Sequence, residues 1–451
     1  MRALPLRVRQ SVLLLVVLTA SASMCLYWKR ITDAVHASRA SSSVLKPKVL
    51  TDLYPSWYGS RELLLHHRNP YGVEVSRELQ IAYYGKKLDS SRPEERQDQQ
   101  RFAYPLYFIF FIAPLAWMPF HAARIVFWWI LVACAVLNVI LWLRFLRLRL
   151  SLPALTALFV LVLTSVPVIQ NLSILQPFLL PACFIAGAAA AIVSGRLFLA
   201  GALLAAATVK PQICLLLLAW FALWLCSDWK RRRSLFFGFL VTLAALVLAS
   251  ECLLPGWMMH YPEVLRSYAE YTKTSSFLGG ILPSPLYWLV AIVALATVAD
   301  LCWRTRRQPA DSTPFALALS SVLSLTVLII PAVFQPFNDV LLLPAVLLVI
   351  RHWRELRRSN PVTRAATSLF CLCAILPPLL AVVAVAYPLT PPRDWVLKLW
   401  SLPLSASTAL PFAAFGMLIL LRKAVATPST SLPVDSAPSR PTGLAAAKEQ
   451  T

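Results

Sequence analysis

One apolar stretch, residues 197–226, decides the fold class; it reads LFLAGALLAAATVKPQICLLLLAWFALWLC. Its thirty residues contain a single charged side chain, Lys210. About 20 predominantly apolar residues are enough for a helix to cross the roughly 30 Å hydrocarbon core of a bilayer. The stretch therefore predicts an integral membrane protein.

The whole chain has the same character. Of its 451 residues, 59% are hydrophobic and 14% are charged, and the mean hydropathy is +0.67. Soluble domains are about 45–50% apolar and about 25% charged. We predict an all-α, polytopic helical bundle of about 10–12 transmembrane helices. After an N-terminal span, candidate spans lie at 102–120, 124–143, 153–169, 177–194, 197–226, 235–254, 286–303, 314–332, 338–350, 366–386 and 399–421.

Basic residues follow the membrane pattern as well. The formal net charge is +22, and the lysines and arginines gather in short clusters between apolar blocks, at 230–233, 304–307, 351–358 and 422–423. Such clusters mark cytoplasmic loops, which puts 255–285, 334–339 and 387–398 outside. No basic stripe with interleaved aromatics lies outside the membrane blocks, so we expect no nucleic-acid partner.

The region 102–226 fits the positive-inside rule poorly. Five full crossings there would bring the chain from the outside to the cytoplasmic cluster at 230–233, but they place Arg144, Arg147 and Arg149 outside the cell. Its blocks are short and broken by prolines, so half-helices or re-entrant segments are an alternative.

Four segments are expected along the chain. Residues 1–28 form a retained signal-anchor span, although a cleaved secretory signal is the alternative. Residues 29–101 are the first extracytoplasmic loop, with amphipathic helices. Residues 102–423 form the multi-span domain, and the Pro/Ser/Thr-rich residues 424–451 form a disordered cytoplasmic tail.

Two polar residues are candidates for chemistry. A lysine in mid-span costs about 2.5–3.5 kcal/mol on insertion scales, so Lys210, followed by the helix-breaking Pro211, either awaits a phosphate or reaches interfacial water where two short helices meet. Asp52 stands among aromatic residues beyond the first span; it could be a general base or a helix N-cap.

Other polar residues are weaker candidates. Gln176, Asn338 and Asp339 could line a cavity or cap helices. The nine cysteines show neither zinc nor disulfide spacing, and no Gly-rich nucleotide loop is present, so we expect no metal and no cofactor.

A series of short motifs occurs in a familiar order. Asp52 with Tyr54, Trp57 and Tyr58 comes first, followed by Arg68-Asn69-Pro70-Tyr71-Gly72, Tyr104-Pro105, Leu175-Gln176-Pro177, Lys210-Pro211 and the Trp/Arg cluster 229–233. In this order, over roughly residues 50–340, the chain resembles glycosyltransferase family 87, the polyprenol-phosphate-mannose-dependent mannosyltransferases of the GT-C class. Leu175 stands where the family has glycine, and Leu106 where it has a second proline.

The resemblance implies an inverting sugar transfer at the extracytoplasmic face of the cell membrane. The donor would be a polyprenyl-phosphate-linked hexose, with mannose the favoured sugar, and the acceptor would be a hydroxyl of a glycan or glycolipid. Asp52 would be the base, and Lys210 would hold the departing phosphate with help from Arg68 or Arg101. The other substrate-binding positions implied are Tyr54, Trp57, Tyr58, Asn69, Tyr71, Tyr104, Gln176, Asn338 and Asp339.

Three other functions compete. A transporter or flippase of lipid-linked sugars would show internal repeats, and we find none in the sequence. A polymerase or ligase of envelope glycans would carry its large loop late in the chain, whereas here it follows the first span. A membrane scaffold would tolerate the loss of Asp52 and Lys210.

Overall fold

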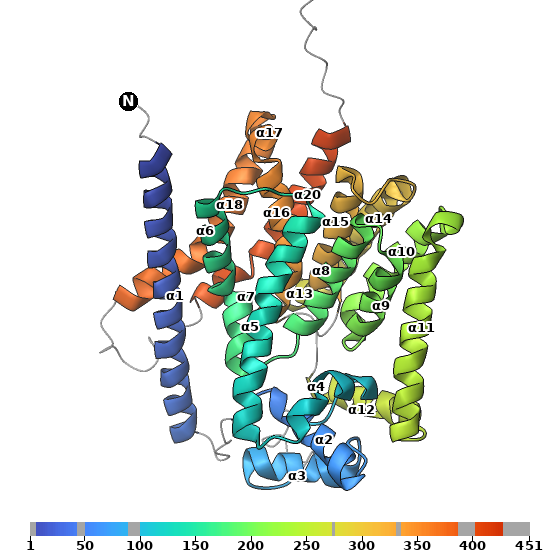
Figure 1. The fold of residues 1–451 in the computed structure, drawn as a ribbon. Helices are drawn as coiled ribbons and strands as arrows, with labels where there is room; N and C mark the ends of the chain where they lie inside the picture. Colours follow the sequence, from blue (N-terminus) through green and yellow to red (C-terminus); the bar gives the residue numbers. More distant parts are fainter. Residues whose placement is uncertain are drawn as a thin grey trace, which may run out of the picture.

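The structure is a computed structural model that describes residues 6–42, 50–88, 100–272, 276–330, 335–386 and 402–426. All regular elements in these ranges are helical, and together they form one upright bundle with a layer of short helices at one end (Figure 1). The predicted all-α polytopic membrane fold is confirmed. The loop at 387–398 and most of the predicted tail, 427–451, lie outside the described residues.

The helices are named here in the order in which they follow one another along the chain. Their order is α1(Leu6–Ser42), α2(Leu53–His66), α3(Val73–Tyr84), η2(Leu106–Phe108), α4(Ile109–Ala116), α5(Phe120–Phe145), α6(Leu152–Leu163), α7(Val166–Ile174), α8(Leu179–Val193), α9(Leu197–Ala207), α10(Pro211–Cys226), α11(Trp229–Leu253), α12(Trp257–Thr272), α13(Phe277–Ile281), α14(Ser284–Thr305), α15(Thr313–Ile329), η3(Pro336–Leu342), α16(Leu343–Arg351), α17(Trp353–Arg358), α18(Pro361–Ala386) and α20(Leu410–Ala426).

The helices differ in whether they are long enough to cross a bilayer. By length and composition, the described residues contain six candidate spans, or seven if α6 and α7, bent by 49°, count as one. Shorter apolar helices lie at most of the other predicted spans, and 338–350 is divided between η3 and α16. The long stretch that opened the sequence analysis is two helices, α9 and α10, because Pro211 cannot continue the helix that precedes it.

Residues 102–120 do not form the predicted crossing. They fold into the short helices η2 and α4, which stay in the layer of α2, α3 and α12 (Figure 1). Trp57 Nε1 and Arg61 Nη1 on α2 donate to the carbonyls of Leu115 and Ala116 at the end of α4. Because three prolines divide this short block and α2 binds its carbonyl end, it lies across the end of the bundle.

The arginine clusters gather at the other end, which we call the basic end. Arg147 pairs with Asp311 at 3.0 Å, Arg351 donates to the Leu146 carbonyl at 2.7 Å, and Arg232 donates to the Arg306 carbonyl at 2.9 Å. The cluster around Arg147 therefore lies on the same side as the later clusters. Of the two alternatives for 102–226, the described helices follow the one with short, broken segments, in which 102–120 is not a crossing and Arg147 lies at the same end as the later clusters.

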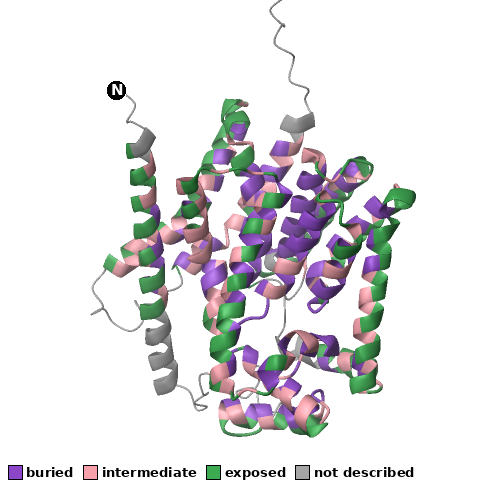
Figure 2. Ribbon diagram, viewed as in Figure 1, coloured by how far each residue is buried: buried purple, intermediate pink, exposed green. Residues whose placement is uncertain are grey.

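The opposite end, which we call the loop end, carries α2, α3 and α12 (Figure 1). Between the two ends, α8 and α15 form the interior; every residue of α15 from Phe315 to Leu328 is buried. Figure 2 shows the contrast with α1 and α11, whose outer faces are exposed along much of their length. A helix that is apolar on an exposed face is suited to lipid contact.

Two glycines allow α9 and α11 to cross closely. A Cβ atom on Gly201 of α9 would lie 2.0 Å from the Leu235 carbonyl oxygen, and one on Gly238 of α11 would lie 2.1 Å from the Phe198 carbonyl oxygen. Small residues allow backbones of membrane helices to approach this closely. α9 is thereby fixed against α11, with Lys210 just beyond its end.

We expect Gly201→Ala to lower the thermal unfolding midpoint by several degrees, because the new methyl group must push α9 and α11 apart and overpacking costs about 1–3 kcal/mol or more. Gly416→Ala is the matched control, since a Cβ there meets nothing within 4 Å. The midpoints are measured on purified proteins in one detergent. Equal midpoints for the two variants would contradict the tight crossing.

Candidate active site

Asp52 lies directly before α2, at the position of an N-cap, but it does not act as one. Its side chain makes no capping hydrogen bond. Instead its Oδ2 accepts a hydrogen bond of 2.9 Å from Gln176 Nε2, and its backbone N–H donates to the Ile174 carbonyl at 2.8 Å. The carboxylate is thus held against the turn between α7 and α8, and the capping interpretation of Asp52 is wrong.

Gln176 is aimed at Asp52 by its own neighbours. Leu175 has a left-handed backbone, with φ 52° and ψ 47°, which reverses the chain after α7. Glycine adopts this conformation without steric cost, whereas Leu175 adopts it with a side chain. Tyr104 donates from its hydroxyl to Gln176 Oε1 at 3.0 Å, so the amide nitrogen is the atom left to face Asp52.

Lys210 approaches the same place from the interior. It lies between α9 and α10, is only 8% exposed, and its Nζ sits 4.5 Å from the Phe178 ring centre and 5.1 Å from that of Phe337. The negative charge of the Asp52 carboxylate interacts favourably with the positive charge of the Lys210 side chain. Two short helices do meet at Lys210, but its side chain is buried, so it does not reach interfacial water.

No described residue forms a hydrogen bond or a salt bridge with the Lys210 ammonium. An ammonium away from water is costly unless it is paired. The two aromatic faces compensate only in part, since a cation–π contact contributes about 0.5–2 kcal/mol. The arrangement is suited to an anion that arrives with a substrate. We call Asp52, Tyr104, Gln176 and Lys210 the Asp52 cluster.

Asn338 and Asp339 lie on η3, next to the Phe337 that contacts Lys210. Both are buried, and Asp339 Oδ1 has no hydrogen-bond partner among the described residues. Asn171 Nδ2 donates to the Phe337 carbonyl at 2.9 Å, which ties η3 to α7. The ring of Phe337 brings η3 to Lys210 of the Asp52 cluster.

The aromatic residues of α2 form a packed layer beside the cluster. The rings of Tyr54 and Tyr58 are stacked with centres 5.8 Å apart, and Tyr54 and Trp57 pack against Phe120 at the start of α5, at 4.8 and 5.0 Å. Tyr54 and Tyr58 are half-buried, whereas Trp57 is buried. The layer joins α2 to α5.

Asn69 and Tyr71 shape the segment that supports Tyr104. Asn69 Oδ1 accepts a hydrogen bond from the Tyr71 backbone N–H at 2.9 Å, and the Tyr71 hydroxyl donates to the Tyr104 carbonyl at 2.7 Å. These two residues therefore reach the Asp52 cluster through Tyr104.

Arg68 is held in an ion-pair network at the loop end. Its guanidinium lies 2.8 Å from Glu62 Oε2 and 2.8 Å from Glu78 Oε1, and Tyr58 donates to Glu78 Oε2 at 2.7 Å. The hydrogen bond from Arg68 lowers the pKa of Glu78 below its ordinary value of 4.5. The charge of Arg68 is thus already matched within the loop.

This network predicts acid sensitivity. Because the pKa of Glu78 is lowered in the folded state, its stabilising effect is present above its ordinary pKa and is lost as pH falls through the lowered one. Arg68→Gln should therefore reduce the loss of thermal midpoint between pH 6 and pH 3, by about 2 °C since the pair is partly exposed. Thermal scans across this range, with Arg147→Gln as control, check it. An unchanged pH dependence in Arg68→Gln would contradict the prediction.

Fold and site together define a polytopic helical membrane protein with a carboxylate and a buried cation gathered at one end of its bundle. The model of glycosyltransferase family 87 matches residues 102–331, slightly more than half of the chain. The chain belongs to glycosyltransferase family 87 and is a membrane glycosyltransferase. Neither the curated proteins nor the solved structures yield a match.

Sequence reasoning missed part of the surroundings of the cluster. Phe178 and Phe337, which flank Lys210, look like ordinary apolar residues of membrane blocks. Pro177-Phe178 and Pro336-Phe337 each follow a polar residue at a helix start, and that shared pattern is the signal that could have identified them.

Proposed function

We propose that this glycosyltransferase transfers a hexose, mannose being the first candidate, from a polyprenyl-phosphate donor to a hydroxyl of a glycan or glycolipid acceptor, with inversion. The observation that carries the proposal is that the Asp52 carboxylate and the Lys210 side chain, 158 positions apart in the sequence, lie near enough to interact electrostatically without a direct ion pair among the described residues. A base for the acceptor and a positive charge for the leaving group are the two parts that this reaction needs.

The chemistry follows from these two groups. Asp52 accepts the proton of the acceptor hydroxyl as its oxygen attacks the anomeric carbon. The bond between that carbon and the phosphate oxygen breaks on the opposite side of the sugar, which inverts the configuration. Lys210 stabilises the negative charge that gathers on the lipid phosphate, and Gln176 holds the carboxylate in position.

The reaction side follows from the two ends of the bundle. Basic clusters stay in the cytoplasm, so the basic end is assigned there. The loop end with the Asp52 cluster then faces the extracytoplasmic side of the cell membrane, where lipid-linked donors replace nucleotide sugars.

Further residues are assigned by their places around the cluster. Tyr54 and Tyr58, the half-buried members of the aromatic layer, are proposed to contact the acceptor, with Trp57 supporting them. Asn69 and Tyr71 position Tyr104, and Arg68 stabilises the loop. Asn338 and Asp339 are proposed to meet the donor where η3 reaches Lys210.

The direct test is a donor panel. Purified protein in liposomes is given polyprenyl-phosphate-linked mannose, glucose and galactose, with GDP-mannose as a nucleotide control, and a glycolipid acceptor. We expect one lipid-linked donor to be consumed with release of polyprenyl phosphate, and GDP-mannose to remain intact. A flippase, the second candidate, would move donors across the membrane and consume none.

A further inference from the structure

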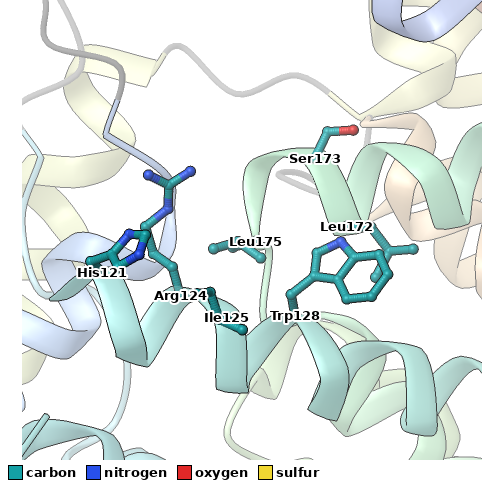
Figure 3. A pocket seen from close by; sticks show the side chains of 7 residues that line it. All are labelled: His121, Arg124, Ile125, Trp128, Leu172, Ser173 and Leu175. Carbon is teal, nitrogen blue, oxygen red and sulfur yellow. The ribbon is translucent and has the colours of Figure 1, made fainter. Parts of the chain in front are cut away.

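A pocket opens beside the Asp52 cluster, between α5 and the end of α7. Its volume is about 460 Å³, within the roughly 300–1,000 Å³ of small-ligand sites. His121 and Arg124 stand at one side, Trp128 and Leu172 at the other, and Leu175 lies between them (Figure 3). Its walls thus combine a polar, cationic side with an apolar one.

The cationic side is suited to an anion. Arg124 is exposed, and among the described residues no carboxylate pairs with it; its guanidinium lies 5.9 Å from the Phe120 ring centre. His121 lies in the first turn of the 26-residue helix α5 and Arg124 at the start of its second turn; the N-cap, Pro119, supplies no capping side chain. The first N–H groups of a helix are unpaired and favour negative charge.

The apolar side faces the bilayer. Ile125 and Trp128 are exposed at 51% and 37% on a helix that is itself a candidate membrane span. Along α5, the positive charge of Arg124 is followed by these exposed apolar side chains. A molecule with an anionic head group and a hydrocarbon chain could contact both. The pocket therefore fits a lipid phosphate that enters sideways from the membrane.

The position of the pocket indicates which lipid it binds. Leu175 in the pocket wall immediately precedes Gln176, which binds Asp52, and the preceding Ile174 carbonyl accepts the Asp52 N–H. A phosphate in this pocket thus lies beside the proposed base. The donor is the substrate whose lipid phosphate is bonded directly to the reacting carbon, so its phosphate must lie within one sugar of that base.

We propose that this pocket binds the donor lipid: Arg124 and the first turn of α5 hold its phosphate, and Trp128, Ile125 and Leu172 hold the first carbons of its polyprenyl chain. This inference rests on the proposed function and adds the lateral binding site. Arg124 contacts the phosphate from the bilayer side, and Lys210 supplies its charge from the interior. After transfer, the polyprenyl phosphate leaves by the same opening.

The test measures binding without turnover. Full-length protein in nanodiscs is titrated with farnesyl phosphate, with farnesol as the uncharged control and phosphatidylglycerol as the competitor. We expect Arg124→Gln to weaken farnesyl phosphate binding about tenfold while farnesol binding stays the same, since charge-assisted hydrogen bonds carry this discrimination. Trp128→Ala should weaken both ligands. Arg124→Lys, which keeps the charge, should lose less than Arg124→Gln, and Arg147→Gln is the matched control.

The outcomes separate this inference from the proposed function. Equal farnesyl phosphate affinity in the wild type and Arg124→Gln would overturn the pocket assignment, as would equally strong competition by phosphatidylglycerol, which would indicate a general anionic-lipid site. Asp52→Asn should bind farnesyl phosphate at least as tightly as the wild type does, because it removes a negative charge beside the phosphate. If the wild type consumes no polyprenyl-phosphate sugar but Arg124 still governs farnesyl phosphate binding, the proposed reaction fails and the lipid site remains.

Discussion

Asp52→Asn should lower the rate of sugar transfer by about 10²–10⁴-fold, the contribution typical of a general base. Asparagine keeps the size of the side chain, and its oxygen can still accept the hydrogen bond from Gln176, but it cannot take up the acceptor proton. The donor KM should change by less than about threefold, because the substituted group acts in the transition state. Initial rates with the donor identified in the panel measure both quantities.

Asp311→Asn is the matched control for this experiment. Asp311 is exposed and pairs with Arg147 at the basic end, so its loss should leave the transfer rate unchanged. Both variants should keep the wild-type thermal midpoint. Transfer at the wild-type rate by Asp52→Asn would remove Asp52 as the base.

Lys210→Met should lower kcat/KM for the donor by about 10²–10³-fold, because the charge that stabilises the departing phosphate is lost. The acceptor KM should stay within about twofold. Methionine fills the space between Phe178 and Phe337 and removes a buried ammonium, which is costly to keep away from water. We therefore expect the thermal midpoint to be equal to that of the wild type or higher.

The control for Lys210 is Lys230→Met, which removes an exposed cation at the start of α11 and should leave transfer unchanged. Donor and acceptor kinetics are measured in the same assay, together with thermal midpoints. Equal losses for donor and acceptor, accompanied by a lower midpoint, would assign Lys210 a structural role in joining α9 to α10.

The sequence located the cluster members better than it located their surroundings. Lys210 and Asp52 stand out because each is a charged group where its neighbours are apolar or aromatic. Gln176 was a weaker candidate, since an amide before a proline is common at helix ends. Arg68 was a candidate to assist Lys210 at the phosphate, but its partners Glu62 and Glu78 already match its charge. Arg124 gave no signal, because arginine at the start of a span is ordinary.

The membrane topology was likewise predictable from the sequence only in part. The apolar blocks could be read directly, yet 102–120 was counted as a crossing because its composition is that of a span. Its place at the loop end depends on hydrogen bonds from Trp57 and Arg61, which lie more than fifty positions earlier. Once this block is moved, the arginines around Arg147 join the other basic clusters.

The sequence by itself determined that the chain is a helical membrane protein, which blocks are apolar, and which polar residues are out of place among them. These properties depend on the free energy of transferring each short stretch from water to lipid. That free energy is set by the residues of the stretch itself, so it can be read from the local sequence. Only the tertiary structure decided that Gln176 binds Asp52, that Lys210 lies within electrostatic reach of this carboxylate, and that the pocket of Arg124 opens nearby. Contacts between distant residues depend on how whole helices pack, through features such as the close approach at Gly201, and no single stretch encodes that packing.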